Sequence, residues 1–223
     1  MTSFMNKTLN ATGIEDQTDD GRLHWPAPAR NKDVILDVLR EVLPGALTPG
    51  GTILEIGAGS GQHTTHFAPQ FPDVVWQATD PDPLHLKSIQ AWFTEGGVTN
   101  AAKPLYLDTR EQPWPVSRAD AVLCINMIHI SPWESCQQLF RGAGEILSGH
   151  GILYLYGPFS VGGRHSAPSN AVFSQSLKAR DPTWGVRDLD EVTALAEKNG
   201  LTLDKTVDMP SNNLSVIYRM RPA

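Results

Sequence analysis

The sequence has few cysteines, no block of basic residues and no long apolar run. Cys124 and Cys136 are its only cysteines, and two unclustered cysteines in 223 residues favour a reducing, cytoplasmic location over a disulfide framework. Its 18 Lys and Arg residues against 24 Asp and Glu residues give a formal net charge of −6. Because duplex binding normally requires a basic surface, nucleic acid is not expected as a partner.

No apolar run approaches the roughly 18 residues of a membrane-spanning helix, and no basic segment with an apolar core marks a signal peptide. We therefore expect no membrane association. The length suits one α/β domain with a sizeable core. We assign residues 23–223 to that domain, and we expect residues 1–22, which are polar and aperiodic, to be either flexible or a lid over a ligand.

The central stretch runs from Thr52 to Gln62. The apolar, β-branched run Thr52–Ile56 predicts a buried parallel strand, and Gly57-Ala58-Gly59-Ser60-Gly61 breaks it and leads into a helix. Glycine at alternate positions lets the backbone adopt conformations closed to other residues and lets a ligand approach closely. This pattern predicts a nucleotide-binding turn. Glu55 is unusual in such a strand, because a buried acid is costly without a partner.

Two kinds of ligand compete for this turn. Dinucleotide sites use Gly-x-Gly-x-x-Gly, whereas the third glycine here comes one residue early, at Gly61. Glu55 completes the pattern Glu-x-Gly-x-Gly-x-Gly, which resembles the first motif of class I S-adenosylmethionine (SAM)-dependent methyltransferases. An acid suits their cationic sulfonium ligand better than it suits a pyrophosphate. A nicotinamide-dependent oxidoreductase remains the alternative.

Acids end the next two predicted strands. Asp80 closes the strand 74–79, where a carboxylate can accept hydrogen bonds from both ribose hydroxyls. Asp80 could also cap the helix predicted over 81–95, and the two roles can coexist. Leu107 and Asp108 end a strand predicted over 100–108, and Asp108 is placed to accept from the adenine amine. With Glu55, these acids come in the order that adenosine recognition would use.

The fourth predicted strand, 119–125, is followed by Asn126 and His129. Reactions in open α/β sheets occur beyond the carboxyl ends of the strands, so both residues should face the transferred group. We assign both to the catalytic set, with His129 as the candidate base because imidazole titrates near neutrality. A purely structural hydrogen-bonding role for His129 is the alternative. His63 and His66 lack a third ligand at suitable spacing, and no metal is expected.

The remaining pattern predicts helices and strands in alternation. Helices are expected over 28–43, 132–147, 169–179 and 188–199, a strand over 151–156, and a functional lid in the loop 157–168. The alternating runs 201–207 and 214–220 predict a closing antiparallel hairpin. The expected fold is a Rossmann-like α/β sheet of seven strands, mostly parallel, with helices on both faces.

From about Leu23 to Met220 the sequence resembles the class I methyltransferases, and more closely the methyltransferase-like protein twenty-six type. The phrases that carry this likeness are 28–32 (Pro-Ala-Arg-Asn-Lys), 126–133 (Asn-Met-Ile-His-Ile-Ser-Pro-Trp), 156–159 (Tyr-Gly-Pro-Phe), 169–170 (Ser-Asn), 180–188 (Arg-Asp-Pro-Thr-Trp-Gly-Val-Arg-Asp) and 212–214 (Asn-Asn-Leu). The resemblance implies SAM binding and names no substrate. The expected cofactor residues are Glu55, Gly57, Ala58, Gly59, Gly61, Asp80, Pro81, Leu107, Asp108, Asn126 and Met127.

The acceptor side is expected to be aromatic and basic. Its candidate residues are Arg30, Asn31, Lys32, His129, Trp133, Tyr156, Phe159, Arg164, Asn170, Trp184 and Arg187. Several arginines suggest an acceptor with a carboxylate or phosphate, although Arg187 and Asp188 could instead pair to fix their loop.

The expected function is methyl transfer from SAM, leaving S-adenosylhomocysteine (SAH), to a small-molecule acceptor with an acidic or phenolic group. The main rival is a non-catalytic SAM-binding module that acts through a protein partner. A macromolecular acceptor is disfavoured by the acidic charge. We expect a monomer or a homodimer.

Overall fold

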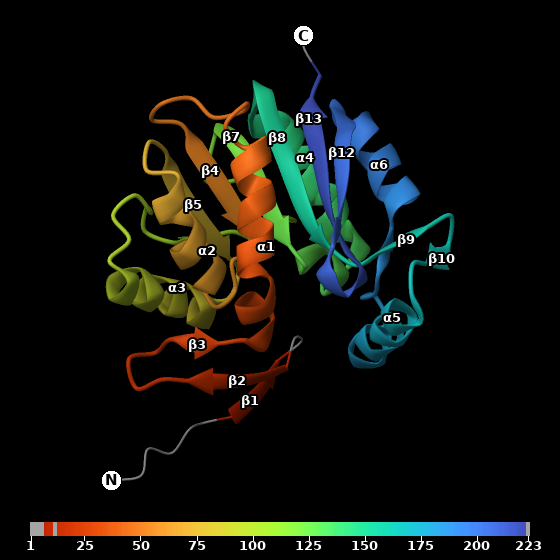
Figure 1. Cartoon of the computed structure of the whole chain (residues 1–223), viewed down its shortest axis with the longest axis horizontal. Helices are drawn as coiled ribbons and strands as arrows, with labels where there is room; N and C mark the ends of the chain where they lie inside the picture. The colour runs from red at the N-terminus through yellow and green to blue at the C-terminus, as the bar shows by residue number, and fades with distance from the viewer. Residues whose placement is uncertain (1–6, 11–12, 222–223) are drawn as a thin grey trace.

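The computed structural model describes residues 7–10 and 13–221, and a seven-stranded sheet forms its centre (Figure 1). From edge to edge the strands are β12 (Leu201–Met209), β13 (Asn213–Met220), β8 (Leu147–Gly157), β7 (Ala119–Ile125), β4 (Thr52–Ile56), β5 (Val75–Asp80) and β6 (Leu105–Tyr106). β13 runs antiparallel to both of its neighbours, and the pairs from β8 to β6 are parallel. The predicted fold class is confirmed.

Helices cover both faces of this sheet. They are α1 (Pro26–Val42), α2 (Gln62–Phe67), α3 (Pro83–Gly96), α4 (Trp133–Ile146) and α6 (Leu189–Lys198), whereas α5 (Pro168–Arg180) lies beside the short strand β10. In Figure 1, α1 lies in front of the sheet and α4 behind it. Along β7, Leu123 packs in the cluster that contains α1 residues, and Val122 packs in the cluster that contains α4 and α6 residues. Alternate side chains point to opposite faces, so a strand buried on both sides is mostly apolar. The charged residue of β7, Asp120, is buried and accepts from the Thr48 N–H and hydroxyl.

Several predicted boundaries differ from the structure, and β8 begins at Leu147 rather than at residue 151. α1 begins at Pro26, two residues early, because proline is tolerated in a first turn. The third strand is only β6, and Pro104 stands directly before it, where proline lacks the N–H that a ladder requires. The cap of α3 is Asp82, whose side chain accepts from the Leu84 N–H, so the capping role for Asp80 is wrong.

The loop 157–168 has structure of its own, so the prediction that it is irregular is wrong, while its role as a lid stays a prediction. It forms β9 (Phe159–Val161) and β10 (Arg164–His165), and β11 (Arg187–Asp188) pairs with β9 in a second sheet. The Asp188 carboxylate holds this sheet together, because it accepts from the Ser160 hydroxyl at 2.9 Å and the Gly163 N–H at 2.8 Å.

A third sheet contains β1 (Lys7–Asn10), β2 (Gly13–Gln17) and β3 (Leu23–His24). Its last strand is fastened to α3: the Leu23 N–H donates to the Ser88 hydroxyl at 2.8 Å, and the Trp92 indole N–H donates to the Leu23 carbonyl at 3.0 Å. Residues 1–6 and 11–12 of the proposed terminal segment lie outside the described residues. The idea that residues 1–22 close over a ligand stays a prediction.

Short 3₁₀ turns complete the chain: η1 (Ala68–Gln70), η2 (Met127–His129) and η3 (Pro210–Asn212). Both cysteines are free and buried. None of the helices in the described part of the chain is long and apolar enough to cross a membrane.

Candidate active site

A cavity of about 320 Å³ lies at the carboxyl ends of β4, β5 and β7. The glycine turn after β4 forms one wall, with φ of 66° at Gly57 and 59° at Gly59, in the left-handed region that favours glycine. A Cβ added to Gly59 would lie 2.3 Å from the Trp25 ring. At these two glycines the turn therefore presents backbone without side chains to the cavity, and the absence of a Cβ at Gly59 leaves room for the Trp25 ring.

Asp80 lies at the centre of this wall, at the end of β5. Its Oδ2 accepts from the Gly59 N–H at 2.9 Å, and its Oδ1 accepts from the Asp82 N–H at 2.9 Å. His85 Nδ1 lies 2.9 Å from the same Oδ1. The carboxylate is thus fixed at the cavity wall, and its acceptor capacity exceeds these contacts, as a ribose diol requires.

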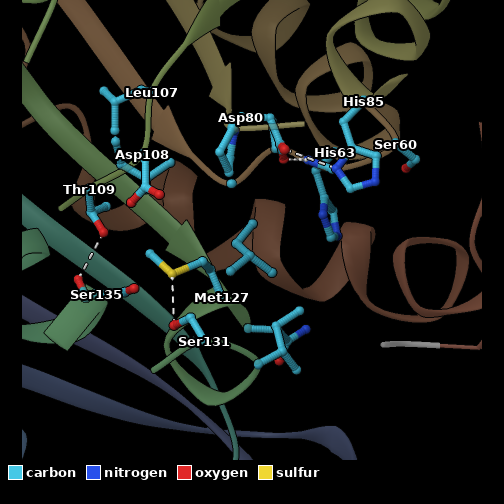
Figure 2. A pocket seen from close by; sticks show the side chains of 18 of the residues that line it. Ser60, His63, Asp80, His85, Leu107, Asp108, Thr109, Met127, Ser131 and Ser135 are labelled. Carbon is cyan, nitrogen blue, oxygen red and sulfur yellow. Dashed lines mark hydrogen bonds and ion pairs between the residues drawn. The ribbon is translucent and has the colours of Figure 1, made fainter. Parts of the chain in front are cut away.

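Figure 2 shows Asp80 and Asp108 on one side of this space, with Met127 and Ser131 on the other. Asp108 is held by Arg110, whose Nη2 donates to Oδ2 at 2.6 Å and whose Nε donates to Oδ1 at 3.0 Å. These hydrogen bonds hold the pKa of Asp108 below its usual range. A charged acid therefore lines the cavity at the end of β6.

Most of the predicted cofactor residues line this one cavity. They are Gly57, Ala58, Gly59, Asp80, Pro81, Leu107, Asp108, Asn126 and Met127. They come from the ends of four neighbouring strands, and parallel strands bring such ends to the same edge of a sheet.

Glu55 does not line the cavity, although it was predicted to contact the ligand. Side chains alternate along β4, so Glu55 shares the face of Ile53 and points beneath α2. Its Oε2 accepts from the Thr64 hydroxyl at 2.5 Å and from the Trp76 indole N–H at 2.8 Å. Burial raises the pKa of Glu55 to about 7. Glu55 supports the glycine turn from below.

Gly61 also lies outside the cavity lining, because its role is packing. Its φ is 92°, and a Cβ there would lie 2.7 Å from the Ile89 Cα of α3. This glycine lets α2 and α3 approach each other.

A second cavity, of about 560 Å³, adjoins the first and shares Ala27, Asn126 and Ile130 with it. Of the predicted acceptor residues, Arg30, Asn31, His129, Tyr156 and Asn170 line this cavity. The turn between β12 and β13 closes it, and the Asn170 amide ties that turn to α5 by donating to the Asn212 carbonyl at 2.9 Å.

Backbone strain concentrates at this second cavity. Asn126, Ser211 and Asn212, with φ of 62°, 61° and 58°, are the non-glycine residues of the described chain with positive φ, and all three line it. Such conformations cost about 1–3 kcal/mol each and cluster at functional sites.

His129 is fully buried in the wall of the second cavity. Its Nδ1 accepts the Arg187 backbone N–H at 3.3 Å, so the proton of the neutral ring resides on Nε2. Burial, with the nearby Arg187 charge, lowers the pKa of His129 to about 3. The ring therefore presents a donor, which does not support its predicted role as a base.

Tyr156 links the two cavities through Asn31. The Tyr156 hydroxyl is hydrogen-bonded by the Asn31 side chain and by the Asn213 amide, the latter at 3.2 Å. Asn31 Oδ1 lies 2.8 Å from Nε2 of His63, which lines the first cavity. Burial lowers the pKa of His63 to about 3, so His63 is neutral.

The other predicted acceptor residues lie outside the second cavity. Arg187 donates to the Ile128 carbonyl at 2.9 Å and the Ser131 carbonyl at 2.6 Å, and its guanidinium lies over the Trp133 ring at 5.4 Å. Arg187 thus fixes the turn that carries His129 by donating to backbone carbonyls, and not by pairing with Asp188. Phe159 packs edge-on against His129 in the core. The remaining three are placed as follows: Lys32 is partly buried on α1, Arg164 is exposed on β10 and Trp184 lines the first cavity.

Several lining residues were not predicted. In the first cavity they are Trp25, Ala27, Pro28, Ser60, His63, His85, Thr109, Arg110, Ser131 and Ser135, among others. Trp25 carries no spacing signal, and it is held at the turn by the contacts of β3 with α3 and by its own N–H, which donates to the Gln62 side chain at 2.8 Å. Asn212 and Asn213 stood in a motif phrase, but the sequence does not place their turn beside α5.

In comparisons with solved structures, an O-methyltransferase family protein from Burkholderia thailandensis matches with a TM-score of 0.75 at 14% identity, over 88% of this chain and 58% of that one. The YcgJ protein from Bacillus subtilis matches with a TM-score of 0.66 at 14% identity, over 87% of this chain and 100% of that one. The mitomycin 7-O-methyltransferase MmcR matches with a TM-score of 0.68 at 19% identity, over 84% of this chain and 54% of that one.

The chain thus spans little more than half of the first and third of these neighbours, and all of the second. At such identities the likeness shows the fold, which is the Rossmann-like class I methyltransferase arrangement. A family model described as "Protein of unknown function (DUF938)" matches residues 22–220.

Proposed function

The chain belongs to the DUF938 family of proteins of unknown function, and from its site we propose that it is a SAM-dependent methyltransferase acting on a small-molecule acceptor with an acidic or phenolic group. The observation that carries this proposal is the pair of adjoining cavities that meet at Asn126. The first suits an adenosine-containing donor, and the second suits an acceptor of small size.

The lining of the first cavity suits SAM in its chemistry. The bare backbone at Gly57 and Gly59 allows close approach, Asp80 provides carboxylate oxygens for a ribose diol, and Asp108 provides an acceptor for an amine. When bound, SAM would supply a methyl group on a sulfonium leaving group. The chain would contribute alignment of two reactants and exclusion of water.

Further parts of the proposal rest on the sequence. The motif phrases support membership of the methyltransferase-like protein twenty-six type, and we propose a single catalytic domain over residues 23–223 in a cytoplasmic protein, as a monomer or a homodimer. Neighbours of the same fold are described as methyltransferases, which supports the reaction class.

Calorimetric titration of the full chain with SAM and SAH tests the cofactor. We expect affinities in the micromolar range, with D80N weakened about 100-fold, or about 2.7 kcal/mol, because the charged acceptor for the ribose is lost. D73N, a change at an exposed acid remote from both cavities, is the matched control and should bind as the natural chain does.

Two results would contradict the proposal. Absence of binding to either ligand, with NADH bound instead, would revive the oxidoreductase alternative. Tight SAM binding without methyl transfer to any small molecule would favour the non-catalytic module acting through a protein partner.

A further inference from the structure

The second cavity offers no group that could remove a proton from an acceptor. Among the described residues that line it, none is Asp, Glu or Lys, and the titratable side chains are Arg30, His129 and Tyr156. Arginine stays charged in proteins and cannot serve as a base at neutral pH. The choice therefore falls on His129 and Tyr156.

His129 is held in the form that donates. The Arg187 backbone N–H occupies Nδ1, which leaves the proton on Nε2. Within the described part of the chain, Nε2 is buried without a hydrogen-bond partner. It lies against Gly157, where an added Cβ would be 2.4 Å away, and next to Asn126, which both cavities share. A buried N–H without a partner is costly, and an acceptor atom on a ligand in the adjoining cavity would satisfy it.

Tyr156 does not supply a base either. Burial raises the pKa of Tyr156 above its ordinary value, so its hydroxyl stays protonated at neutral pH. Since the Asn31 and Asn213 side chains already bond this oxygen, the hydroxyl proton is left for another partner.

The rest of the lining favours negative charge. Arg30 adds a cation from α1, and α5, of 13 residues, begins at the cavity with Ser169 and Asn170 in its wall. A helix N-terminus attracts anions. Pro158, Phe173 and Pro210 supply apolar contacts for the body of such a ligand.

We propose that the second cavity binds a small carboxylic acid as its carboxylate, and that the reaction product is its methyl ester. This inference rests on the proposed function. One carboxylate oxygen accepts from His129 Nε2, and the other attacks the methyl carbon in line. The new C–O bond forms as the C–S bond breaks, the electron pair leaves with sulfur, and no proton moves.

A carboxylate explains the lining where a phenol or an amine does not. Phenols and protonated amines must lose a proton to become nucleophiles, and general-base catalysis of that step requires a positioned group. A carboxylate is already ionised at neutral pH because its pKa is near 4. The locked donor at His129 and the positive surroundings then serve binding alone.

The product test uses SAM labelled in its methyl group, the full chain and a protein-free extract of small molecules as the acceptor source. Methyl esters release labelled methanol in mild alkali, whereas methyl ethers and methylamines keep their label. We expect most of the transferred label to be volatile after alkali. Alkali-stable label would overturn this inference and leave the proposed function standing. No transfer at all, with SAM bound, would overturn both.

A binding test does not depend on turnover. Calorimetry compares 3-phenylpropanoate with its neutral isostere 3-phenylpropanamide, and we expect the acid to bind at least about tenfold more tightly, as charge-assisted hydrogen bonds allow. Equal affinity, or a preference for the amide, would contradict the proposal.

Variants assign that preference to residues. H129L removes the donor and should weaken the acid about tenfold at unchanged SAM affinity, whereas H129Q keeps a donor and should recover most of the loss. R30Q should weaken the acid and spare the amide. R40Q, on the same helix and remote from both cavities, is its matched control. Unchanged acid affinity in both H129L and R30Q would overturn the assignment.

Discussion

The two cavities meet at Asn126, yet the chain builds them in different ways. The first lies at the ends of neighbouring parallel strands, and its predicted polar groups Asp80, Asp108 and Asn126 stand at or just beyond the ends of β5, β6 and β7. The second is assembled from α1, η2, β8, α5 and the turn between β12 and β13. A short motif can therefore specify a site when the sheet topology alone brings its residues together. A site assembled from segments that are distant in the sequence has no such motif.

A buried acid lies beneath the first cavity and gives it a pH dependence of its own. This acid is Glu55, with its pKa raised to about 7 from 4.5. An acid whose folded pKa is raised stabilises the protein below its unfolded pKa, and that stability is lost as pH rises through the folded value. We expect the free energy of unfolding of E55Q, relative to the natural chain, to rise by about 3 kcal/mol between pH 4.5 and 8.

Chemical denaturation of both proteins across that pH range measures this difference. Gln keeps an oxygen that can accept from Thr64 and Trp76, so the neutral variant separates charge from hydrogen bonding. Parallel stability curves would show that Glu55 does not titrate on folding in this way.

Gly59 tests the first cavity separately from the second. In G59A the new methyl group would meet the Trp25 ring at 2.3 Å, and alanine is strained at the positive φ of this position. We expect SAM affinity to fall about 100-fold, or about 2.7 kcal/mol, measured by calorimetry. The preference of the second cavity for 3-phenylpropanoate over its amide should survive in this variant. Its loss would mean that the cavities are not independent.

Gly157 is the corresponding test of the second cavity. A methyl group there would lie 2.4 Å from His129 Nε2 and displace the ring. We expect G157A to lower methyl transfer to a small-molecule extract about tenfold, or about 1.4 kcal/mol, at unchanged SAM affinity. G149A, where an added Cβ meets nothing within 4 Å, is the matched control. Weakened SAM binding in G157A would place its effect in the first cavity instead.

Asn31 should couple the two cavities, because its side chain is hydrogen-bonded to His63 in the first cavity and to Tyr156 in the second. We expect N31A to weaken both SAM and 3-phenylpropanoate modestly, by about 1 kcal/mol or less each, since one neutral hydrogen bond is lost on either side. K32A, on the same helix and lining neither cavity, should change neither affinity. A loss confined to one ligand would show that Asn31 serves only that cavity.

The fold was predictable because its signals are local. The run 121–125 is apolar throughout, which is typical of a strand buried on both faces, and it lies within β7. Asp188 and Leu189 were predicted to open a helix, and Asp188 caps α6 by accepting from the Asp190 N–H. In the loop 157–168 the short local pair β9–β10 was missed, and the second partner of β9, β11, lies more than twenty residues further along the chain, where no local pattern records it.

By itself the sequence determined the order of the strands and helices of the seven-stranded sheet, the glycine turn, and the acids at the ends of the second and third strands, because periodicity and turn chemistry act over a few residues. Only the tertiary structure decided which polar groups were already paired. It turned Glu55 beneath α2, locked the His129 proton on Nε2 through the Arg187 N–H, and placed Trp25 against Gly59. Each of these depends on a partner brought from a distant segment, and no local pattern records such a partner.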